Sequence, residues 1–318
     1  MAPRREVGVR LLLWHVHGSW TTAFVQGHHE YFVPVVPGRG PDGRGRARTW
    51  RWPQRVREVS PGDMRELDVD AIVLQRPSEL ALAEEWLGRR PGRDLPAVYV
   101  EHNAPQGRIG EMRHPVADMP ELTLVHVTHF NSLFWDAGGT ATCVIEHGIV
   151  DPGYRYTGEL PRAAAVINEA RRRARVTGTD LLERLASDTP VDLFGMDARA
   201  LGGIDDVPQS QLHVEMARRR VYLHPIRWTS LGLSLIEAMH LGMPVVALAT
   251  TEAPEAVPPQ AGVISTRVEV LARAIREFVH DRDRALRAGR EARAVALRRY
   301  GLERFLGDWD ALLGQVAG

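Results

Sequence analysis

Glu237 is a carboxylate in a largely apolar stretch, residues 233–239, which follows a small-residue loop containing Gly232. The loop predicts the start of a helix, whose unpaired backbone N–H groups and positive dipole end form an anion site. Glu237 lies about two turns into this segment. A carboxylate among apolar side chains needs a polar partner, which the hydroxyl groups of a ligand would supply.

The forty basic residues are all arginine, and they are balanced by forty acidic residues. The lack of lysine excludes a phosphate-loop nucleotidase, a protein kinase and a pyridoxal enzyme, because each of these requires one. The charge balance leaves no whole-molecule field to hold nucleic acid or an anionic membrane. Any phosphate must therefore be held locally, with arginine as the cation.

Histidines offer a rival chemistry, a zinc site. His15 and His17 alternate along one predicted strand, and His126, His129 and His147 lie near the ends of later strands, so three ring nitrogens could converge on a metal. The sequence lacks the His-Glu-x-x-His pair of zinc hydrolases, the Gly-x-Ser-x-Gly elbow of serine hydrolases and the Gly-x-Gly-x-x-Gly loop of dehydrogenases. We therefore expect no bound metal and no cofactor.

Short apolar or β-branched runs alternate with helical patterns along the first half of the chain. Strands are predicted at 9–16, 31–36, 71–74, 97–101 and 122–128. A helix is predicted at 78–89, with Ser78 as its N-cap. Residues 39–57, rich in Gly, Pro and Arg, predict an exposed loop.

The same alternation starts again after the Gly- and Pro-bearing stretch 151–161. Strands are predicted at 164–167, 191–194, 221–224 and 244–248, and helices at 180–186, 209–218, 230–241 and 267–299. Strands that alternate with helices predict a parallel sheet covered on both faces. The fold class is therefore α/β, with two Rossmann-like parallel-sheet domains facing a cleft.

The sequence shows neither an apolar segment suited to membrane insertion nor a pair of cysteines for a disulfide. Residues 1–10 carry charges but no apolar run of signal-peptide length, and the apolar stretch 231–249 contains Glu237 and His240. Cys143 is the single cysteine. These features predict a cytoplasmic protein with no transmembrane segment, although peripheral contact with a membrane stays open.

The segment around Glu237 resembles the donor-site motif of the family-four (group 1) retaining glycosyltransferases, which are two-domain GT-B enzymes. Their pattern is Glu, seven residues, Glu, followed by Ala-Met, a glycine and a Pro-Val-Val strand. This chain has Thr229 at the position of the first Glu. The matching residues are Gly232, Leu235, Glu237, Ala238, Met239, Gly242 and 244–247.

Weaker matches follow in the order that the family has. They are the first glycine-bearing loop at 17–19, the step into the second strand at 27–30, the strand end with the family's active-site histidine at 99–102, the end of the first domain at 144–149 and the returning helix at 300–313. The resemblance covers nearly the whole chain. It implies an acceptor-side domain at 1–155, a nucleotide-sugar donor domain at 156–299 and a terminal helix at 300–318 that returns to the first domain.

The family's clamp for the donor diphosphate is where the match is poorest. The family has an Arg and a Lys there, and this chain has Thr177 in place of the lysine. Arg171, Arg172 and Arg173 are candidates to supply the charge, because a planar guanidinium suits bidentate contact with phosphate. The alternative is that the three form a solvated charge run.

The resemblance implies a metal-independent transfer of a sugar from a nucleoside diphosphate donor to an acceptor hydroxyl, with retention at the anomeric carbon. Glu237 would bind the ribose, and His102 and Thr229 would border the transferred sugar as the other catalytic residues. The expected donor-binding residues are Gly18, Arg171, Arg172, Arg173, Ser230, Leu231, Gly232, Leu233 and Glu237.

Two rivals stay open. A noncatalytic GT-B protein would bind a nucleotide sugar or support a partner glycosyltransferase, and a GT-B epimerase would convert the nucleotide sugar alone. The acceptor, whether a glycan, a lipid or a small molecule, is not readable. The loops at 37–57 and 103–115 would shape its site, in which Trp50 and Trp52 could stack on a sugar or lipid or fold back onto the domain.

Overall fold

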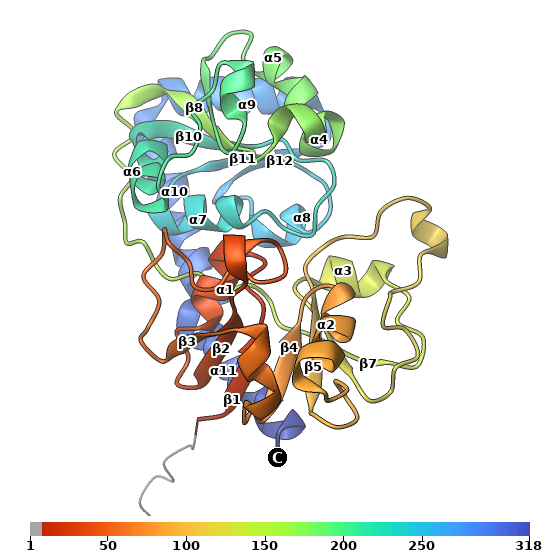
Figure 1. Ribbon diagram of the computed structural model, residues 1–318. Helices are drawn as coiled ribbons and strands as arrows, with labels where there is room; N and C mark the ends of the chain where they lie inside the picture. The colour runs from red at the N-terminus through yellow and green to blue at the C-terminus, as the bar shows by residue number, and fades with distance from the viewer. Residues whose placement is uncertain (1–7) are drawn as a thin grey trace, which may run out of the picture. The chain divides into compact units, whose positions relative to one another are not determined.

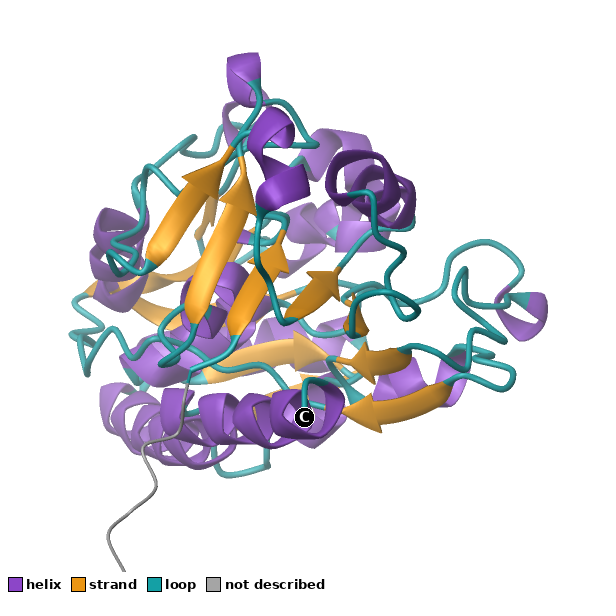
Figure 2. Cartoon of the chain, turned by 60° about the horizontal axis from the view of Figure 1, so that its bottom comes forward, coloured by secondary structure: helices purple, strands orange, loops and turns teal. Residues whose placement is uncertain are grey.

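The computed structural model describes residues 8–318, so most of the stretch 1–10 used to predict localisation lies outside the described residues. The chain divides into two compact units. Unit 1 is the chain up to Gly148 together with Leu302–Gly318, and unit 2 is Ile149–Gly301. Each contains one parallel sheet, and helices flank the strands (Figures 1 and 2). No described helix is long and apolar enough to cross a membrane.

Unit 1 is built on a seven-stranded sheet of order β3-β2-β1-β4-β5-β6-β7, with every pairing parallel. The strands are β1 (Arg10–Leu13), β2 (Glu30–Pro34), β3 (Val56–Val59), β4 (Ala71–Leu74), β5 (Ala97–Glu101), β6 (Thr123–His126) and β7 (Ala141–Val144). The sequence prediction missed β3 and β7, the two edge strands of this sheet, because they carry fewer buried side chains than the inner strands.

The helices of unit 1 are α1 (Gly18–Phe24), α2 (Ser78–Leu87), α3 (His129–Phe134) and α11 (Leu302–Val316), with the 3₁₀ turns η1 (Pro37–Arg39), η2 (Pro61–Glu66) and η3 (Ile109–Glu111). Ser78 is not the N-cap of α2, because Pro77 holds that position without a side-chain cap. Pro77 is helical and Ser78 is already inside the first turn. The left-handed Gly88 ends the helix.

The terminal helix α11, dark blue in Figure 1, packs into unit 1 although it follows unit 2 in the sequence. Phe305, Trp309 and Leu313 recur every fourth residue and are fully buried. The Trp309 ring lies edge-on to Trp20 and Phe24 of α1, with centroids 5.8 and 5.0 Å apart. An aromatic cluster of this kind anchors the helix through burial of its largest side chains.

Unit 2 is built on a five-stranded parallel sheet of order β12-β11-β10-β8-β9. The strands are β8 (Leu160–Val166), β9 (Val191–Phe194), β10 (Arg219–His224), β11 (Val245–Leu248) and β12 (Gly262–Ser265). Consecutive residues of β8, β10 and β11 are fully buried, and since they point alternately to opposite faces, both faces of the sheet are covered.

The helices of unit 2 are α4 (Ala170–Thr177), α5 (Leu182–Leu185), α6 (Gln209–Arg218), α7 (Leu233–Leu241), α8 (Ala253–Ala256), α9 (Val268–His280) and α10 (Arg282–Arg299), with the 3₁₀ turns η4 (Thr179–Leu181) and η5 (Ala198–Leu201). The single helix predicted at 267–299 is two helices. Asp281 separates them, because its backbone is extended and its side chain caps α10 by accepting from Arg284 N at 2.8 Å.

Candidate functional site

The β10–α7 loop of unit 2 brings backbone amides to the start of a helix. Gly232 is the N-cap of α7 and has no side chain to cap the first turn, in which Leu235 N–H donates to Gly232 O at 3.0 Å. A Cβ at Gly232 would lie 2.5 Å from the His224 ring, which explains the glycine. Thr229 and Leu233 are half-buried, whereas the Ser230 and Leu231 side chains are buried, so Leu231 offers only its backbone to a ligand.

Glu237 lies on α7 and is 5% exposed. Its Oε2 accepts a hydrogen bond of 2.9 Å from Gln209 Nε2 and lies 3.6 Å from His213 Nε2. The apolar residues that flank Glu237 in α7 are fully buried, and the partners of its carboxylate include two side chains from α6 that the sequence analysis missed. Gln209 and His213 stand at i and i+4 of a polar helix, a pattern that does not distinguish them from surface residues.

The three predicted clamp arginines lie on α4, a short helix with a kink at Ala174 (φ 20°). Arg172 forms an ion pair with Glu169, and its Nε donates to Glu169 Oε1 at 2.8 Å. Arg171 is exposed and Arg173 is half-buried. The hydrogen bond from Arg172, together with the charges of Arg172 and Arg173, lowers the pKa of the Glu169 carboxyl, so Arg172 is the member of the set that Glu169 engages most directly.

Arg227 supplies a further guanidinium and lies in the β10–α7 loop itself. Its backbone N–H donates to Val176 O at 2.9 Å, and its guanidinium donates to both oxygens of Asp180 at 2.5 and 2.9 Å. This bidentate contact lowers the pKa of the Asp180 carboxyl. The sequence analysis missed Arg227 because one more arginine in so arginine-rich a chain carries no signal.

A surface cavity of about 600 Å³ adjoins this ion pair. It is lined by three arginines, one aspartate, two threonines and three apolar side chains. The lining residues are Arg175, Asp180, Leu181, Arg184, Arg227, Leu248, Thr250, Thr266 and Val268. Glu237 and its partners Gln209 and His213 are not among the residues that line this cavity. The Thr250 hydroxyl donates to Ile226 O at 2.9 Å, which ties the cavity wall to the same loop.

In unit 1, the ends of three neighbouring strands converge on His102. Gln75 follows β4 and His102 follows β5, and the His102 Nε2 lies 3.0 Å from Gln75 Oε1. The Gln75 amide nitrogen donates to Trp14 O at 2.7 Å, which fixes the oxygen of the amide toward His102. His102 Nε2 must therefore carry the ring proton, and Nδ1 holds the lone pair.

Two more histidine rings lie near His102, which is 7% exposed. The His17 ring centroid lies 4.0 Å and the His147 centroid 6.4 Å from that of His102, and Gly18 follows His17 at the start of α1. Burial lowers the pKa of His17 to about 4 and of His147 to about 3, and it holds the pKa of His102 well below its usual range. The structure thus places His102 and Gly18 at the same edge of the sheet, with all three imidazoles neutral near pH 7.

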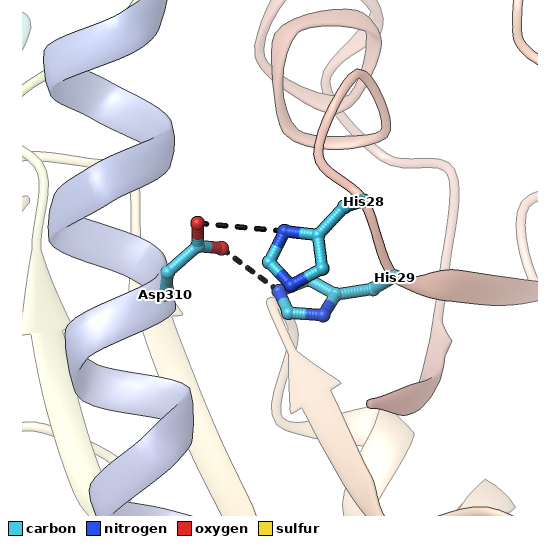
Figure 3. A group of neighbouring side chains, drawn as sticks. All are labelled: His28, His29 and Asp310. Atoms are coloured by element: carbon cyan, nitrogen blue, oxygen red, sulfur yellow. Dashed lines mark hydrogen bonds and ion pairs between the residues drawn. The ribbon is translucent and has the colours of Figure 1, made fainter. Parts of the chain in front are cut away.

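The histidines considered for a zinc site are not brought together as a group of ligands in the part of the chain that the structure describes. Within residues 8–318, one group of three potential ligands has its ligand atoms within 4.8 Å of one another, and it consists of His28, His29 and Asp310. Figure 3 shows both rings turned toward the Asp310 carboxylate. The His29 Nε2 lies 2.9 Å from Oδ1, and the His28 Nδ1 lies 3.6 Å from Oδ2.

The hydrogen bonds of His29 disfavour a metal in this group. Val9 N–H donates to His29 Nδ1 at 3.1 Å, so that nitrogen carries no proton and the proton is on Nε2. A histidine that ligates a metal normally donates from its other nitrogen, whereas here the other nitrogen accepts. His29 is therefore placed as a donor to Asp310 rather than as a metal ligand.

The loop at 39–57 is ordered by its own polar groups. Trp52 is buried, and its Nε1 donates to Thr22 Oγ1 at 2.9 Å, so this ring folds back onto unit 1. Arg46 donates to the carbonyls of Trp52 and Pro53 at 2.8 and 3.0 Å. The half-buried Trp50 places its Nε1 3.6 Å from the Cβ position of Gly18.

Residues 204–295 match the family described as glycosyl transferases group 1. This segment runs from the approach to α6 through most of α10, so it includes Gln209, His213 and Glu237. No curated protein sequence matches the chain.

Solved structures share the fold over nearly the full chain. The sucrose-phosphate synthase tll1590 of Thermosynechococcus elongatus superposes with a TM-score of 0.73 at 14% identity, covering 96% of this chain and 98% of that one. A glycosyltransferase from Rickettsia africae gives 0.70 at 12% identity, covering 97% and 98%. Anabaena Alr3699/HepE, solved in complex with UDP, gives 0.69 at 15% identity, covering 97% and 100%. These neighbours are GT-B glycosyltransferases, and the predicted fold class is confirmed.

Proposed function

We propose that this chain, which has the GT-B fold and matches the group 1 glycosyltransferase family over residues 204–295, transfers a sugar from a nucleoside diphosphate donor to an acceptor hydroxyl. The observation that carries the proposal is the pairing of a buried carboxylate with an uncapped helix start on α7. The carboxylate suits the hydroxyl groups of a ribose, and the helix start suits a phosphate. A nucleoside diphosphate presents both groups.

In this proposal the leaving diphosphate is stabilised by unit 2. Backbone amides at Ser230–Leu233 would donate to the phosphate oxygens as charge develops, with Arg171 or Arg173 as the balancing cation. Arg172 is the weakest of the three candidates because Glu169 already engages it. Cations and amides of this kind make a bound metal ion unnecessary, which supports the proposal of a metal-independent enzyme.

The transferred sugar would lie against His102 and Thr229. The neutral His102 ring presents a lone pair at Nδ1, so its dipole can stabilise positive charge at the anomeric carbon without itself being a cation. Gly18 would let the first loop approach the donor closely. Retention of the anomeric configuration is proposed from the family resemblance.

Binding of nucleotides tests the proposal first. Anabaena Alr3699/HepE was solved in complex with UDP and with UDP-glucose, so these are the first probes, followed by guanosine, adenosine and thymidine diphosphates and their sugars. Calorimetric titration of the whole chain, with and without chelator, should show one nucleoside diphosphate that binds in both conditions. Lack of binding by every nucleotide would overturn the proposal.

A noncatalytic nucleotide-sugar-binding protein is the second candidate. It is favoured by Thr177 and Thr229, which stand where the family has a lysine and a glutamate. Thr177 uses its hydroxyl within unit 2, donating to Ala174 O at 3.2 Å. Such a protein would bind a nucleotide sugar with saturation but release no nucleoside diphosphate.

A further inference from the structure

We infer that Gln209 and His213 are positioning residues that hold the Glu237 carboxylate in place for the ribose of the donor. The inference rests on the proposed function, because it assumes that Glu237 meets a ribose. It concerns the group formed by Gln209, His213 and Glu237, in which α6 supplies two side chains and α7 the third. His213 and Glu237 are 6% and 5% exposed, so water provides little alternative hydrogen bonding.

The orientation of the Gln209 amide follows from its neighbours. Its terminal nitrogen lies 2.9 Å from Glu237 Oε2 and 2.8 Å from His213 Nε2. With the amide turned over, its carbonyl oxygen would face the carboxylate at the same distance, an acceptor against an acceptor. The NH₂ group must therefore face Glu237.

This orientation also determines the tautomer of His213. An NH₂ group has two hydrogens, and the second one points to His213 Nε2. That nitrogen must accept, so the ring proton of His213 is on Nδ1. The 3.6 Å separation of His213 Nε2 from Glu237 Oε2 is then not a direct hydrogen bond. Gln209 is the link between the other two.

The order of hydrogen bonds gives each residue a distinct role. Gln209 and His213 lie one turn apart on α6, so the two side chains meet on one side of that helix. The His213 lone pair holds the Gln209 amide, and the amide holds the plane of the carboxylate. A carboxylate has about four acceptor positions, so the bond from Gln209 restricts its rotation without exhausting its acceptors. A carboxylate that is already oriented loses less side-chain entropy when it binds adjacent ribose hydroxyls.

The test compares ribose recognition in Gln209→Met and Gln211→Met. Methionine keeps the length of the side chain but cannot donate, and Gln211 is an exposed residue of the same helix that serves as the control. Each variant is titrated with the ribonucleoside diphosphate that binds the wild type and with its 2′-deoxy counterpart. We expect the wild type and Gln211→Met to favour the ribonucleotide about tenfold, and Gln209→Met to favour it about twofold.

A second pair of variants tests the role of His213. In His213→Gln the side-chain oxygen can still accept from Gln209, whereas His213→Leu removes the acceptor. His213→Gln should keep most of the ribose preference, and His213→Leu should reduce it as Gln209→Met does. Where turnover is measurable, the donor KM of His213→Leu and of Gln209→Met should rise about tenfold over that of the wild type, with a smaller change in kcat. Far-UV circular dichroism of each variant controls for folding, and the His213 pair keeps the test decisive if Gln209→Met does not fold.

The outcomes separate the two claims. If the wild type binds no nucleoside diphosphate, the proposed function fails and the inference fails with it. If the wild type prefers the ribonucleotide and folded Gln209→Met and His213→Leu keep the full preference, the positioning role is wrong while the proposed function stands. Reduced preference in both variants with retention in His213→Gln supports the inference.

Discussion

His29 Nε2 donates to Asp310 Oδ1 over 2.9 Å although 281 residues separate them in the sequence. His29 precedes β2 and Asp310 lies on α11, so this bond joins the start of the second strand to the helix that returns to unit 1. His29 is 4% exposed, which shields the bond from water. Together with the Trp309 contacts it holds α11 in unit 1.

Replacement of Asp310 should weaken unit 1. Asp310→Ala leaves the buried His29 N–H without its acceptor, and we expect a loss of about 1–3 kcal/mol in the free energy of unfolding. Asp310→Asn keeps an acceptor oxygen and should lose about half as much. Seven of the eight tryptophans, all but Trp228, lie in unit 1, so urea unfolding followed by tryptophan fluorescence reports on it. Equal stability of Asp310→Ala and wild type would show that the bond does not anchor α11.

Zinc should not stabilise the protein through this group. Val9 N–H donates to His29 Nδ1, so the ring proton of His29 is on Nε2. A cation bound at Nε2 would have to displace this proton and would break the hydrogen bond to Asp310. We expect the same melting temperature in a thermal scan with equimolar zinc as in a control scan with chelator. An increase that Asp310→Ala abolishes would instead identify a metal site.

The stability of unit 1 should fall as the pH is lowered from about 6.5 toward 4. Burial lowers the folded-state pKa of His17 and His126 to about 4 and of His147 to about 3, and it holds the pKa of His102 well below its usual range. In the unfolded chain these groups bind protons near pH 6.5. The free energy of unfolding is therefore unaffected by these groups above pH 6.5. Below pH 6.5 it falls by about 1.4 kcal/mol per pH unit for each histidine, because the unfolded chain binds a proton that the folded chain does not.

Removal of one of these histidines checks the assignment. His147→Gln should reduce the slope of the unfolding free energy between pH 6.5 and 4 by the contribution of a single group. His129, which is exposed, provides the control in His129→Gln, whose slope should match the wild type. Identical slopes in all three proteins would contradict the neutral burial of His147.

Gly178 should tolerate no side chain. It has φ +71° at the end of α4, and a Cβ there would lie 1.8 Å from Pro225 O in the β10–α7 loop. Gly178→Ala should therefore be insoluble or destabilised by more than about 3 kcal/mol, because it adds a clash to the left-handed backbone cost. Gly202 has φ +76° with no atom within 4 Å of its Cβ position, so Gly202→Ala should lose about 1–2 kcal/mol. Similar stabilities of the two variants would refute the close approach.

Much of the fold could be predicted from the sequence. The strands β4, β5 and β9 and the helix α6 have the bounds that the sequence predicted. The edge strands β3, β7 and β12 were missed, since pairing with a neighbour defines them and their own residues do not. Periodicity continues across Asp281, so the break between α9 and α10 depends on a local cap that a pattern of apolar residues does not detect.

The candidate site was less predictable than the fold. Glu237 was found because a charge in an apolar run stands out, and His102 through the family resemblance. Gln75, Gln209 and His213 were missed, because each matters through a partner that is distant in the sequence or on another helix. The functional roles of all the named site residues, Glu237 and His102 included, stay predictions.

Release of nucleoside diphosphate from a nucleotide sugar tests the central claim most directly. The whole chain is incubated with each sugar of the nucleotide that binds, with a panel of hydroxyl acceptors, and the released diphosphate is quantified. Glu237→Ala should lose about a hundredfold or more of the rate, whereas Glu291→Ala, an exposed carboxylate on α10, should match the wild type. We predict release that depends on Glu237 and proceeds in chelator. Binding without release from any sugar and acceptor, or release unchanged in Glu237→Ala, would contradict the account.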